Sequence, residues 1–263
     1  MAFRMKKVLT IAGSDCSGGA GIQADLKTMT AHKVYGMSVI TALTAQNTTG
    51  VYGIFETDPA FVAQQLDCVF TDIVPDAVKI GMVSSAEIIR VIAQKLTQYH
   101  AKNIVLDPVM VATSGGKLIA DHAAEAMISD LIPAADLITP NLPEAECLCG
   151  FSIEEKNGMA EAARELSRFC KKGILIKGGH LSDTADDLLY VNGTLHWFSR
   201  ERIDTENTHG TGCTLSSAIA CNLAMGFSME ESVKNAKDYI TGALKAGLNL
   251  GKGNGPMNHC YAL

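Results

Sequence analysis

Charged and aromatic side chains are scarce in this chain of 263 residues: they make up 19% and 6% of it, and tryptophan occurs once. Hydrophobic residues reach 47%. Disordered chains combine low hydrophobicity with high net charge, so this composition predicts a folded protein. No apolar run approaches the roughly 18 residues of a membrane-spanning helix, and the run over residues 8–12 is too short for the core of a signal peptide. We therefore expect a cytoplasmic protein with no membrane partner.

Basic residues are in the minority. Lys+Arg number 22 against 28 Asp+Glu, which gives a formal net charge of −6 at pH 7. Nucleic-acid-binding domains usually carry a basic patch or stripe, so we expect no nucleic-acid partner. An anionic ligand would have to be bound by a local group of residues, because the overall field of the protein does not attract it.

The cysteine pattern excludes two kinds of structural staple. The eight cysteines are too few for a disulfide scaffold and include no C-x-x-C pair. The histidines are not spaced with them as in a tetrahedral zinc site. This pattern predicts a reducing compartment, in which most of the thiols are small buried side chains without chemistry. Cys213 is the exception, for a reason given below.

Short apolar runs alternate with amphipathic segments along the chain. Runs typical of strands cover residues 7–12, 38–45, 77–80, 103–106, 136–139 and 173–177, and a hairpin is expected over 187–191 and 195–199. Helices are expected over residues 22–33, 59–73, 86–98, 123–131, 161–171, 214–225 and 230–248, with one more beginning at Pro143. Asp58 is expected to cap the helix that starts at Pro59.

This alternation predicts an α/β fold with a mostly parallel central sheet and helices on both faces. No linker-like or repetitive tract marks a boundary, so we expect a single domain over residues 1–263. In open sheets of this kind, ligands bind beyond the carboxyl ends of the strands. Residues that directly follow strands are therefore the candidates for a functional site.

A glycine-rich run follows the first strand, with glycines at positions 13, 18, 19 and 21. Glycines at a strand-to-helix turn let the backbone approach a ligand closely and leave N–H groups free at the helix start. Gly19 and Ala20 stand where a Walker A loop carries its Lys and Ser/Thr, and the spacing does not fit G-x-G-x-x-G. Asp25, one helical turn beyond Gly21, is placed to accept a substrate hydroxyl. The alternatives are a turn that merely packs and a solvated helix residue.

A second run, Asn207-Thr208-His209-Gly210-Thr211-Gly212-Cys213-Thr214, leads into an apolar helix. We expect the N–H groups of Gly210, Thr211, Gly212 and Cys213 to converge at the helix N-terminus and form an anion hole for a transferring phosphoryl group. The same helix end lowers the pKa of a thiol, so we expect a Cys213 thiolate that accepts a proton from a substrate hydroxyl. The alternative is an inert cysteine.

Four more polar residues follow strands: Asp107, Asn141, Glu144 and Lys177. Carboxylates with an amide suit Mg²⁺, which takes oxygen ligands and keeps several waters. A lysine suits a phosphate as a point charge. The alternatives are an ordinary helix cap for Asn141 and solvated charges for Glu144 and Lys177.

Gln46 stands at the end of the second strand. A glutamine amide carries both a donor and an acceptor, so it matches a heterocycle edge that bears an amine next to a ring nitrogen. The alternative is a solvated turn residue.

Several motifs, in order along the chain, resemble those of one enzyme family. They are the run Gly13-Ser14-Asp15 to Lys27, Ala45-Gln46-Asn47-Thr48, Lys79-Ile80-Gly81-Met82, Asp107-Pro108-Val109-Met110, Thr139-Pro140-Asn141-Leu142-Pro143-Glu144, Lys177-Gly178-Gly179-His180, Asn207 to Thr214, and Gly253-Asn254-Gly255-Pro256. The chain is identified by them as a member of the hydroxymethylpyrimidine/phosphomethylpyrimidine kinases of the thiamin pathway, which belong to the ribokinase-like superfamily.

This resemblance implies a ribokinase-like fold and a phosphotransferase activity. The γ-phosphoryl group of ATP would pass to the hydroxymethyl group of 4-amino-5-hydroxymethyl-2-methylpyrimidine, and a second transfer to the monophosphate would give the diphosphate. The resemblance further implies ATP as co-substrate, Mg²⁺ as cofactor and a cytoplasmic homodimer.

The resemblance also assigns roles to residues. The implied substrate-binding residues are Gln46 at the amino edge of the pyrimidine, Asp25 near the hydroxyl, and Gly13, Met82 and Val109 around the ring. The implied residues for phosphoryl transfer are Gly210, Thr211, Gly212 and Cys213 as anion hole with Cys213 as base, Lys177, Asn141 and Asp107 for ATP, and Asp107 and Glu144 for Mg²⁺. Two positions depart from the family pattern: Cys16 replaces a usual proline, and Asn258 replaces the first of two paired histidines.

Two other functions stay open at this point. A pyridoxal or pyridoxine kinase of the same superfamily also phosphorylates a hydroxymethyl heterocycle. A non-catalytic vitamin-binding module on the same scaffold would not need the anion hole. The residues of the anion hole are present in this chain, which argues against such a module. A dinucleotide oxidoreductase is excluded because its glycine fingerprint is missing.

Overall fold

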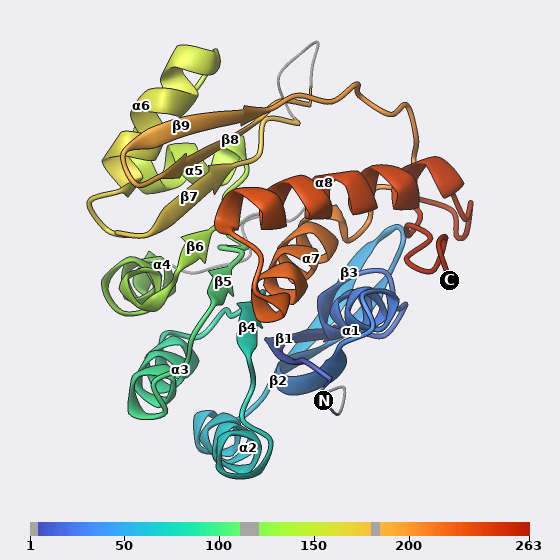
Figure 1. The fold of residues 1–263 in the computed structure, drawn as a ribbon. Coiled ribbons are helices and arrows are strands. Elements are labelled where there is room, and N and C mark those ends of the chain that lie inside the picture. The colour runs from blue at the N-terminus through green and yellow to red at the C-terminus, as the bar shows by residue number, and fades with distance from the viewer. Residues whose placement is uncertain (1–4, 111–120, 180–184) are drawn as a thin grey trace.

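The computed structural model of the chain describes residues 5–110, 121–179 and 185–263. Over these residues, nine strands form one sheet in the order β3-β2-β1-β4-β5-β6-β7-β8-β9 (Figure 1). The six strands in the middle of this order are all parallel to one another: β2, β1, β4, β5, β6 and β7. The strand β3 at one edge and the pair β8 and β9 at the other are antiparallel. The predicted α/β fold with a mostly parallel sheet is confirmed.

The strands are β1 (Lys7–Asp15), β2 (Tyr35–Asn47), β3 (Gly50–Glu56), β4 (Ala77–Ile80), β5 (Ile104–Leu106), β6 (Leu137–Ile138), β7 (Gly173–Ile176), β8 (Asp187–Val191) and β9 (Thr194–Phe198). The helices are α1 (Gly21–Ala31), α2 (Pro59–Asp72), α3 (Ala86–Gln98), α4 (Asp121–Ala126), α5 (Leu142–Cys149), α6 (Lys156–Leu166), α7 (Thr211–Met225) and α8 (Met229–Ala246). A π-helical turn over Met127–Leu131 continues α4.

Helices cover both faces of the sheet, as predicted. In Figure 1, α1, α7 and α8 lie on one face, and α2, α3 and α4 lie on the other. Successive residues of a strand point to opposite faces, so Val8 joins the buried cluster under α7 while Leu9 and Ile11 join the cluster under α2 and α3. The strands that the sequence shows as unbroken apolar runs are therefore buried on both faces of the sheet.

Helix ends follow the signals in the sequence with one clear exception. Asp58 accepts hydrogen bonds from the backbone N–H groups of Ala60 and Phe61, and Pro59 is the first residue of α2, as predicted. The helix predicted over residues 161–171 instead spans Lys156–Leu166. Its buried face consists of Met159, Ala162, Ala163 and Leu166. The helix ends at Leu166, although Cys170, one turn further on, is buried in the same core.

Strand β3 was not predicted. It pairs antiparallel with the end of β2, from Ala42 with Glu56 to Asn47 with Gly50. Nearly all of its side chains are exposed, so it lacks the alternation of buried and polar residues by which a half-buried strand is recognised in a sequence. The long β2–β3 hairpin that results extends the sheet beyond the point where Gln46 stands.

The cysteines correct another expectation. Cys170 and Cys221 are buried, Cys149 and Cys213 are partly buried, and Cys16, Cys68, Cys147 and Cys260 are exposed. The low exposure typical of free cysteine is a statistical tendency, and these exposed thiols lie on helix surfaces and turns where nothing packs over them. Within the described residues, no helix is long and apolar enough to cross a membrane.

A completely buried ion pair lies at the centre of the fold. The ammonium of Lys79 in β4 donates to both carboxylate oxygens of Asp25 in α1, each at 2.9 Å, and neither side chain has exposed surface. The hydroxyls of Thr10 in β1 and Ser217 in α7 donate to the same carboxylate, each at 2.6 Å. Burial acts to lower the pKa of Lys79, but the Asp25 carboxylate outweighs burial and raises it. The pair is therefore charged and joins two strands to two helices.

We predict that Lys79→Met lowers the free energy of unfolding by about 3–5 kcal/mol, because it leaves the Asp25 carboxylate buried without a cation. The double variant Lys79→Met/Asp25→Leu should recover much of this loss, since replacing both charges of a buried pair by apolar groups is often tolerated. Chemical denaturation of purified variants measures the difference.

Lys95→Met is the matched control. Its ammonium lies 2.6 Å from Asp67, a shorter distance than in the central pair, but the Asp67 side chain is 39% exposed. Its loss should cost about 1 kcal/mol or less. Equal losses in Lys79→Met and Lys95→Met would show that burial does not set the strength of the central pair.

Candidate active site

The carboxyl ends of five parallel strands bring the predicted site residues to one edge of the sheet. Asp15 ends β1, and Met82, Asp107, Asn141 and Lys177 each lie within three residues of the ends of β4, β5, β6 and β7. The chain moves from β1 first to β2 and later to β4 on the other side of β1. This is a topological switch point, the place where open parallel sheets bind ligands.

The N-terminus of α7 lies against the glycine-rich run. Gly210 caps α7 with a left-handed backbone (φ 83°). A Cβ atom at Gly210 would lie 1.9 Å from the carbonyl oxygen of Gly19, so only glycine permits this contact. The N–H of Thr211 donates to the carbonyl of Thr208 at 3.3 Å, so this group of the predicted anion hole already has a partner in its own turn. Gly212 and Cys213 occupy the first turn, where N–H groups have no acceptor within the helix.

The same helix end faces the charged residues. A Cβ atom at Gly212 would lie 3.1 Å from Oδ2 of Asp107 and 3.4 Å from the ammonium of Lys177. The absence of a side chain at Gly212 therefore lets the helix N-terminus lie close to a carboxylate and an ammonium. The structure brings Gly212, Asp107 and Lys177 together, as the sequence predicts.

Cys213 lies where the N-termini of α1 and α7 meet. Burial raises the pKa of its thiol, and the carboxylates of Asp25 and Asp107 add to that effect. The ammonium of Lys79 and a hydrogen bond from the backbone of Gly21 act in the opposite direction, but they do not outweigh burial. The expectation of a lowered pKa is therefore wrong: removal of water from the thiol disfavours the thiolate more than the helix end favours it.

Lys177 forms the centre of a charged cluster. Its ammonium lies 2.8 Å from Oδ1 of Asp107 and 4.0 Å from Oε2 of Glu144. The Thr139 hydroxyl donates to the same Asp107 oxygen at 3.1 Å. Burial acts to lower the pKa of Lys177, but the two carboxylates outweigh burial and raise it, so the ammonium stays charged. We refer to Asp107, Glu144 and Lys177 as the phosphate cluster.

Glu144 and Asn141 cap helix α5 reciprocally. Oδ1 of Asn141 accepts from the N–H of Glu144 at 2.9 Å, and Oε2 of Glu144 accepts from the N–H of Asn141 at 2.8 Å. Glu144 is buried, so it is not the solvated charge that the sequence left open. Burial raises the pKa of Glu144 to about 7, against the opposing effect of Lys177. Asn141 does act as a helix cap, and this use of its side-chain oxygen leaves its NH₂ group for other contacts.

The residues expected around the substrate ring lie on neighbouring strand ends. A Cβ atom at Gly13 would lie 2.8 Å from the terminal methyl group of Met82, so Gly13 and Met82 are in contact. Met82 and Val109 are partly buried and follow β4 and β5. Gln46, in β2, is also partly exposed, and its Oε1 accepts from the Thr44 hydroxyl at 3.1 Å.

Asp25 lies apart from these residues. Its carboxylate has no exposed surface and is held by Lys79, Thr10 and Ser217. It is not a solvated helix residue, and in this structure it reaches the rest of the site only through its effect on the Cys213 thiol. His180, which closes the motif after Lys177, lies outside the described residues.

Sequence reasoning missed the contact between Asp15 and His209. Oδ2 of Asp15 lies 2.8 Å from Nε2 of His209, and 194 positions separate these residues in the chain. Both residues stand in the two glycine-rich motifs that the sequence singles out, but nothing in either motif shows that they meet. The C-terminal loop also contacts His209: the carbonyl of Gly255 accepts from the N–H of His209 at 3.0 Å.

Comparisons with known proteins agree with this geometry. The model of the phosphomethylpyrimidine kinase family matches residues 15–258. The chain is 52% identical to the thiamine biosynthesis bifunctional protein ThiED of Geobacter sulfurreducens over 99% of its own length, and it spans about half (53%) of that protein. It is 48% identical to the hydroxymethylpyrimidine/phosphomethylpyrimidine kinase of Streptomyces coelicolor, over 97% of this chain and 95% of that one.

A solved structure extends the comparison to a related activity. The pyridoxal kinase of Staphylococcus aureus in complex with ADP has a TM-score of 0.92 and 35% identity, over 98% of this chain and 95% of that one. The match to the family model and the two sequence relatives cover nearly the whole chain. The chain therefore belongs to the phosphomethylpyrimidine kinase family.

Proposed function

We propose that the chain, as a single domain over residues 1–263, transfers the γ-phosphoryl group of ATP to 4-amino-5-hydroxymethyl-2-methylpyrimidine and then phosphorylates the monophosphate. The observation that carries this proposal is the close approach of Gly212, at the N-terminus of α7, to Asp107 and Lys177. Phosphoryl transfer needs positioning and stabilisation of charge more than covalent chemistry. A helix N-terminus with an ammonium beside it supplies both.

Lys177, Asn141 and the start of α7 would bind ATP together. Lys177 provides a positive charge, and Asn141 provides donors from its NH₂ group. The N–H groups of Gly212 and Cys213 have no acceptor within the helix at the N-terminus of α7. Together these groups would hold the transferring phosphoryl group while negative charge shifts among its oxygens.

The donor set of the phosphate cluster fits Mg²⁺. Asp107 and Glu144 present carboxylate oxygens on either side of Lys177. No group of three or more His, Cys, Asp or Glu side chains that could hold a metal occurs within residues 5–110, 121–179 and 185–263. Two carboxylates suit an ion that arrives with the nucleotide and keeps several waters, rather than an ion in an all-protein cage. When bound, Mg²⁺ would neutralise charge on the phosphates.

The substrate side is formed by Gln46, Gly13, Met82 and Val109. Gln46 presents an acceptor and donors side by side, which match an amine next to a ring nitrogen. Contact between Gly13 and Met82 places a flat backbone segment next to a polarisable side chain, a surface suited to an aromatic ring. Asp25 supports this side by fixing α1 against β4 rather than by touching the substrate.

Cys213 is the proposed proton acceptor. Its thiol is neutral at pH 7 because burial raises its pKa. The substrate hydroxyl would deliver its proton to the minor thiolate form, whose population rises with pH. The ammonium of Lys79 stabilises the thiolate form of Cys213, so Lys79 of the buried pair would contribute to the chemistry as well as to the fold.

The direct test is mass analysis of the products formed from the aminopyrimidine alcohol with Mg·ATP. We expect the monophosphate first and the diphosphate afterwards. Cys213→Ala should still bind the alcohol, while its kcat falls about 10²–10⁴-fold, the usual contribution of a positioned base. The kcat of the unmodified enzyme should rise between about pH 7 and pH 9, and the residual kcat of Cys213→Ala should not.

Two results would contradict this assignment. Near-normal turnover by Cys213→Ala would remove Cys213 as proton acceptor without affecting the kinase assignment. A preference of more than about tenfold for pyridoxal over the aminopyrimidine alcohol would favour the second candidate function, pyridoxal kinase. The observation behind that candidate is the likeness to the pyridoxal kinase of Staphylococcus aureus.

Glu144 gives a prediction on pH dependence. Its pKa of about 7 in the folded protein lies above the value near 4.3 of an unfolded chain. Between about pH 5 and pH 7 the folded protein therefore binds more protons, and its free energy of unfolding falls as pH rises. Glu144→Gln should show a smaller fall, because glutamine keeps the reciprocal cap of α5 without the charge. Urea denaturation across this pH range, without divalent ions, measures it.

Glu161→Gln is the control for this pH series, because Glu161 is exposed on the neighbouring helix α6. It should follow the pH dependence of the unmodified protein. If Glu144→Gln followed that course too, Glu144 would not be the group that takes up the proton.

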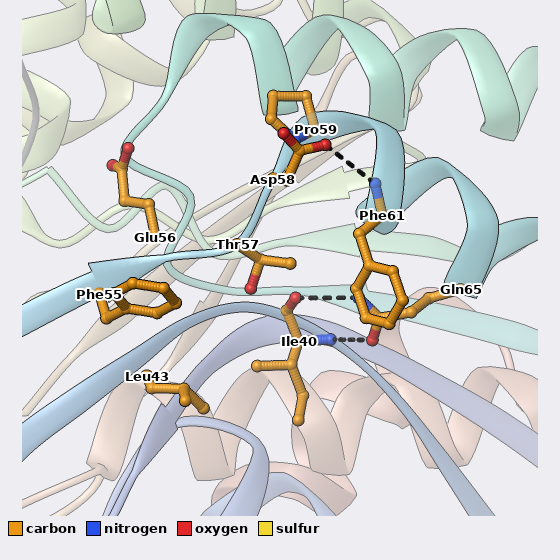
Figure 2. A pocket seen from close by; sticks show the side chains of 9 residues that line it. All are labelled: Ile40, Leu43, Phe55, Glu56, Thr57, Asp58, Pro59, Phe61 and Gln65. Atoms are coloured by element: carbon orange, nitrogen blue, oxygen red, sulfur yellow. Dashed lines mark hydrogen bonds between the residues drawn. The ribbon is translucent and has the colours of Figure 1, made fainter.

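We further propose that the chain acts as a cytoplasmic homodimer that pairs through the β2–β3 hairpin. Exposed apolar side chains gather on this hairpin and at the start of α2, and we call them the hairpin surface: Leu43, Val51, Tyr52, Ile54, Phe55 and Phe61. Several of them line a hollow of about 670 Å³. Phe55 lies on one side of it and Phe61 on the other (Figure 2). Edge strands of monomers usually carry charged residues or proline that prevent pairing. Strand β3 has one charged residue, Glu56 at its end.

Two hydrogen bonds between Gln65 and the backbone of Ile40 hold the floor of this hollow. Oε1 of Gln65 accepts from the N–H of Ile40 at 2.9 Å, and its Nε2 donates to the carbonyl of Ile40 at 3.2 Å (Figure 2). A glutamine that pairs with the strand backbone in this way leaves the apolar side chains around it as the groups free to meet a partner. An exposed apolar patch on a fixed floor is typical of a protein interface.

Phe55→Arg should convert the dimer to a monomer, because it places a charge in the middle of the hairpin surface. Light scattering after size-exclusion chromatography measures the mass. Thr194→Arg, which lies exposed on the opposite edge strand β9, should leave the mass unchanged. A monomeric unmodified protein at micromolar concentration would contradict the dimer, and a dimeric Phe55→Arg would place its interface elsewhere.

A further inference from the structure

The imidazole of His209 lies between two residues that belong to different parts of the chain. Its Nε2 is 2.8 Å from Oδ2 of Asp15 and 3.4 Å from Nε2 of Gln46. Asp15 ends β1, Gln46 stands near the end of β2, and His209 precedes α7. One ring nitrogen thus faces two candidate partners, and a nitrogen that donates to one of them cannot accept from the other.

Asp15 decides which partner the nitrogen takes. Besides His209, its carboxylate accepts hydrogen bonds from the backbone N–H groups of Ser17, Gly19 and Ala20 and from the Ser17 hydroxyl, at 2.7–3.1 Å. Burial acts to raise the pKa of Asp15, but the hydrogen bonds from His209 and Ser17 outweigh it and hold the pKa well below its usual range. Asp15 is therefore a carboxylate that only accepts, and Nε2 of His209 must carry the proton.

The ring of His209 is fixed in place. A Cβ atom at Gly19 would lie 2.3 Å from Cδ2 of the ring and 3.2 Å from Cβ of Pro256, so the ring occupies the space that glycine leaves. The backbone of His209 pairs with Pro256 and donates to the carbonyl of Gly255. The imidazole therefore cannot turn its other nitrogen toward Gln46 without moving two loops.

This arrangement leaves the amide of Gln46 available. A protonated Nε2 of His209 cannot accept from the NH₂ group of Gln46, so that group keeps its donors for a ligand. The Oε1 of Gln46 shares the Thr44 hydroxyl, which also lies 3.0 Å from the carbonyl of Ser14. With the opposite tautomer, Nε2 of His209 would accept from Gln46 and compete with the ligand for the same donor.

We propose that the Asp15–His209 pair is a positioning device for substrate selectivity: it keeps the Gln46 amide unpaired and oriented to read an amine next to a ring nitrogen. His209 acts through Gln46 and does not touch the reacting atoms. The proposal rests on the proposed function, because it takes Gln46 as the residue that reads the pyrimidine edge. It adds a residue from the anion-hole motif to substrate recognition.

The first test compares two variants on two substrates. Asp15→Asn replaces a carboxylate that only accepts by an amide that can also donate, so Nε2 of His209 can lose its proton and accept from Gln46. With the aminopyrimidine alcohol, Asp15→Asn should raise KM about 5- to 20-fold, the size expected for one or two hydrogen bonds. Its kcat and its KM for ATP should change less than about twofold. The double variant Asp15→Asn/His209→Phe should restore most of the KM, because phenylalanine cannot accept from Gln46.

The desamino analogue, 5-hydroxymethyl-2-methylpyrimidine, is the control substrate. It lacks the amine, so its KM should be nearly the same in the unmodified enzyme and in Asp15→Asn. An equal rise in KM for both pyrimidines, or a parallel loss in kcat and in the KM for ATP, would reduce His209 to a packing residue and overturn the proposal. Failure of the unmodified enzyme to phosphorylate either pyrimidine would instead overturn the proposed function.

The second test does not depend on turnover. Long-range ¹⁵N–¹H correlation spectra of protein labelled at its seven histidines report the tautomer of each ring. The signals missing from His209→Gln identify His209. We expect a proton on Nε2 in the unmodified protein without substrate. A neutral ring with its proton on Nδ1 would overturn the proposal.

Discussion

The buried ion pair between Lys79 and Asp25 is the interaction on which the rest of the site depends. A carboxylate and an ammonium without exposed surface are costly to bury, and each is tolerable only because the other is present. The same carboxylate accepts from Thr10 and Ser217, so it fixes α7 relative to β1 and α1. Those elements position the thiol of Cys213 and the N-terminus of α7, where Gly212 lies against Asp107 and Lys177 of the phosphate cluster. Their geometry therefore depends on the Lys79–Asp25 ion pair, which has no exposed surface.

Above this pair, the site is built by backbone approach rather than by side chains. A single methyl group would prevent the contact of Gly210 with Gly19 and would crowd that of Gly212 with Asp107. Close approach of two loops puts the N-termini of α1 and α7 at the same place, around Cys213. This also explains why the thiol is not a thiolate: the packing that delivers two helix ends removes water from the sulfur. Lys79 offsets only part of that loss.

The sequence predicts the sheet well because its buried strands are short apolar runs with clear ends, and Asp58 and Pro59 mark the start of α2 as expected. It predicts the phosphate cluster because parallel strands end at one edge, so residues after strands must be neighbours. It does not predict β3, whose apolar side chains are exposed. It also misses the pairing of Asp15 with His209, because a contact across 194 positions leaves no local pattern. The prediction of a lowered pKa for Cys213 fails for a related reason. Burial of the thiol depends on the whole fold, whereas the helix N-terminus can be recognised from the local sequence.

The acidic balance of the chain acquires a physical meaning at the phosphate cluster. Lys177 brings one positive charge, but Asp107 lies 2.8 Å away and Glu144 4.0 Å away. The local sum is zero when Glu144 is protonated and −1 when it is ionised, so the side chains alone do not attract a triphosphate. Backbone N–H groups at the start of α7 supply only partial positive charge. A polyphosphate can therefore bind tightly here only together with a cation, and the two carboxylates that would repel it are the groups that would hold that cation. The charge of the cluster therefore supports the proposed requirement for Mg²⁺.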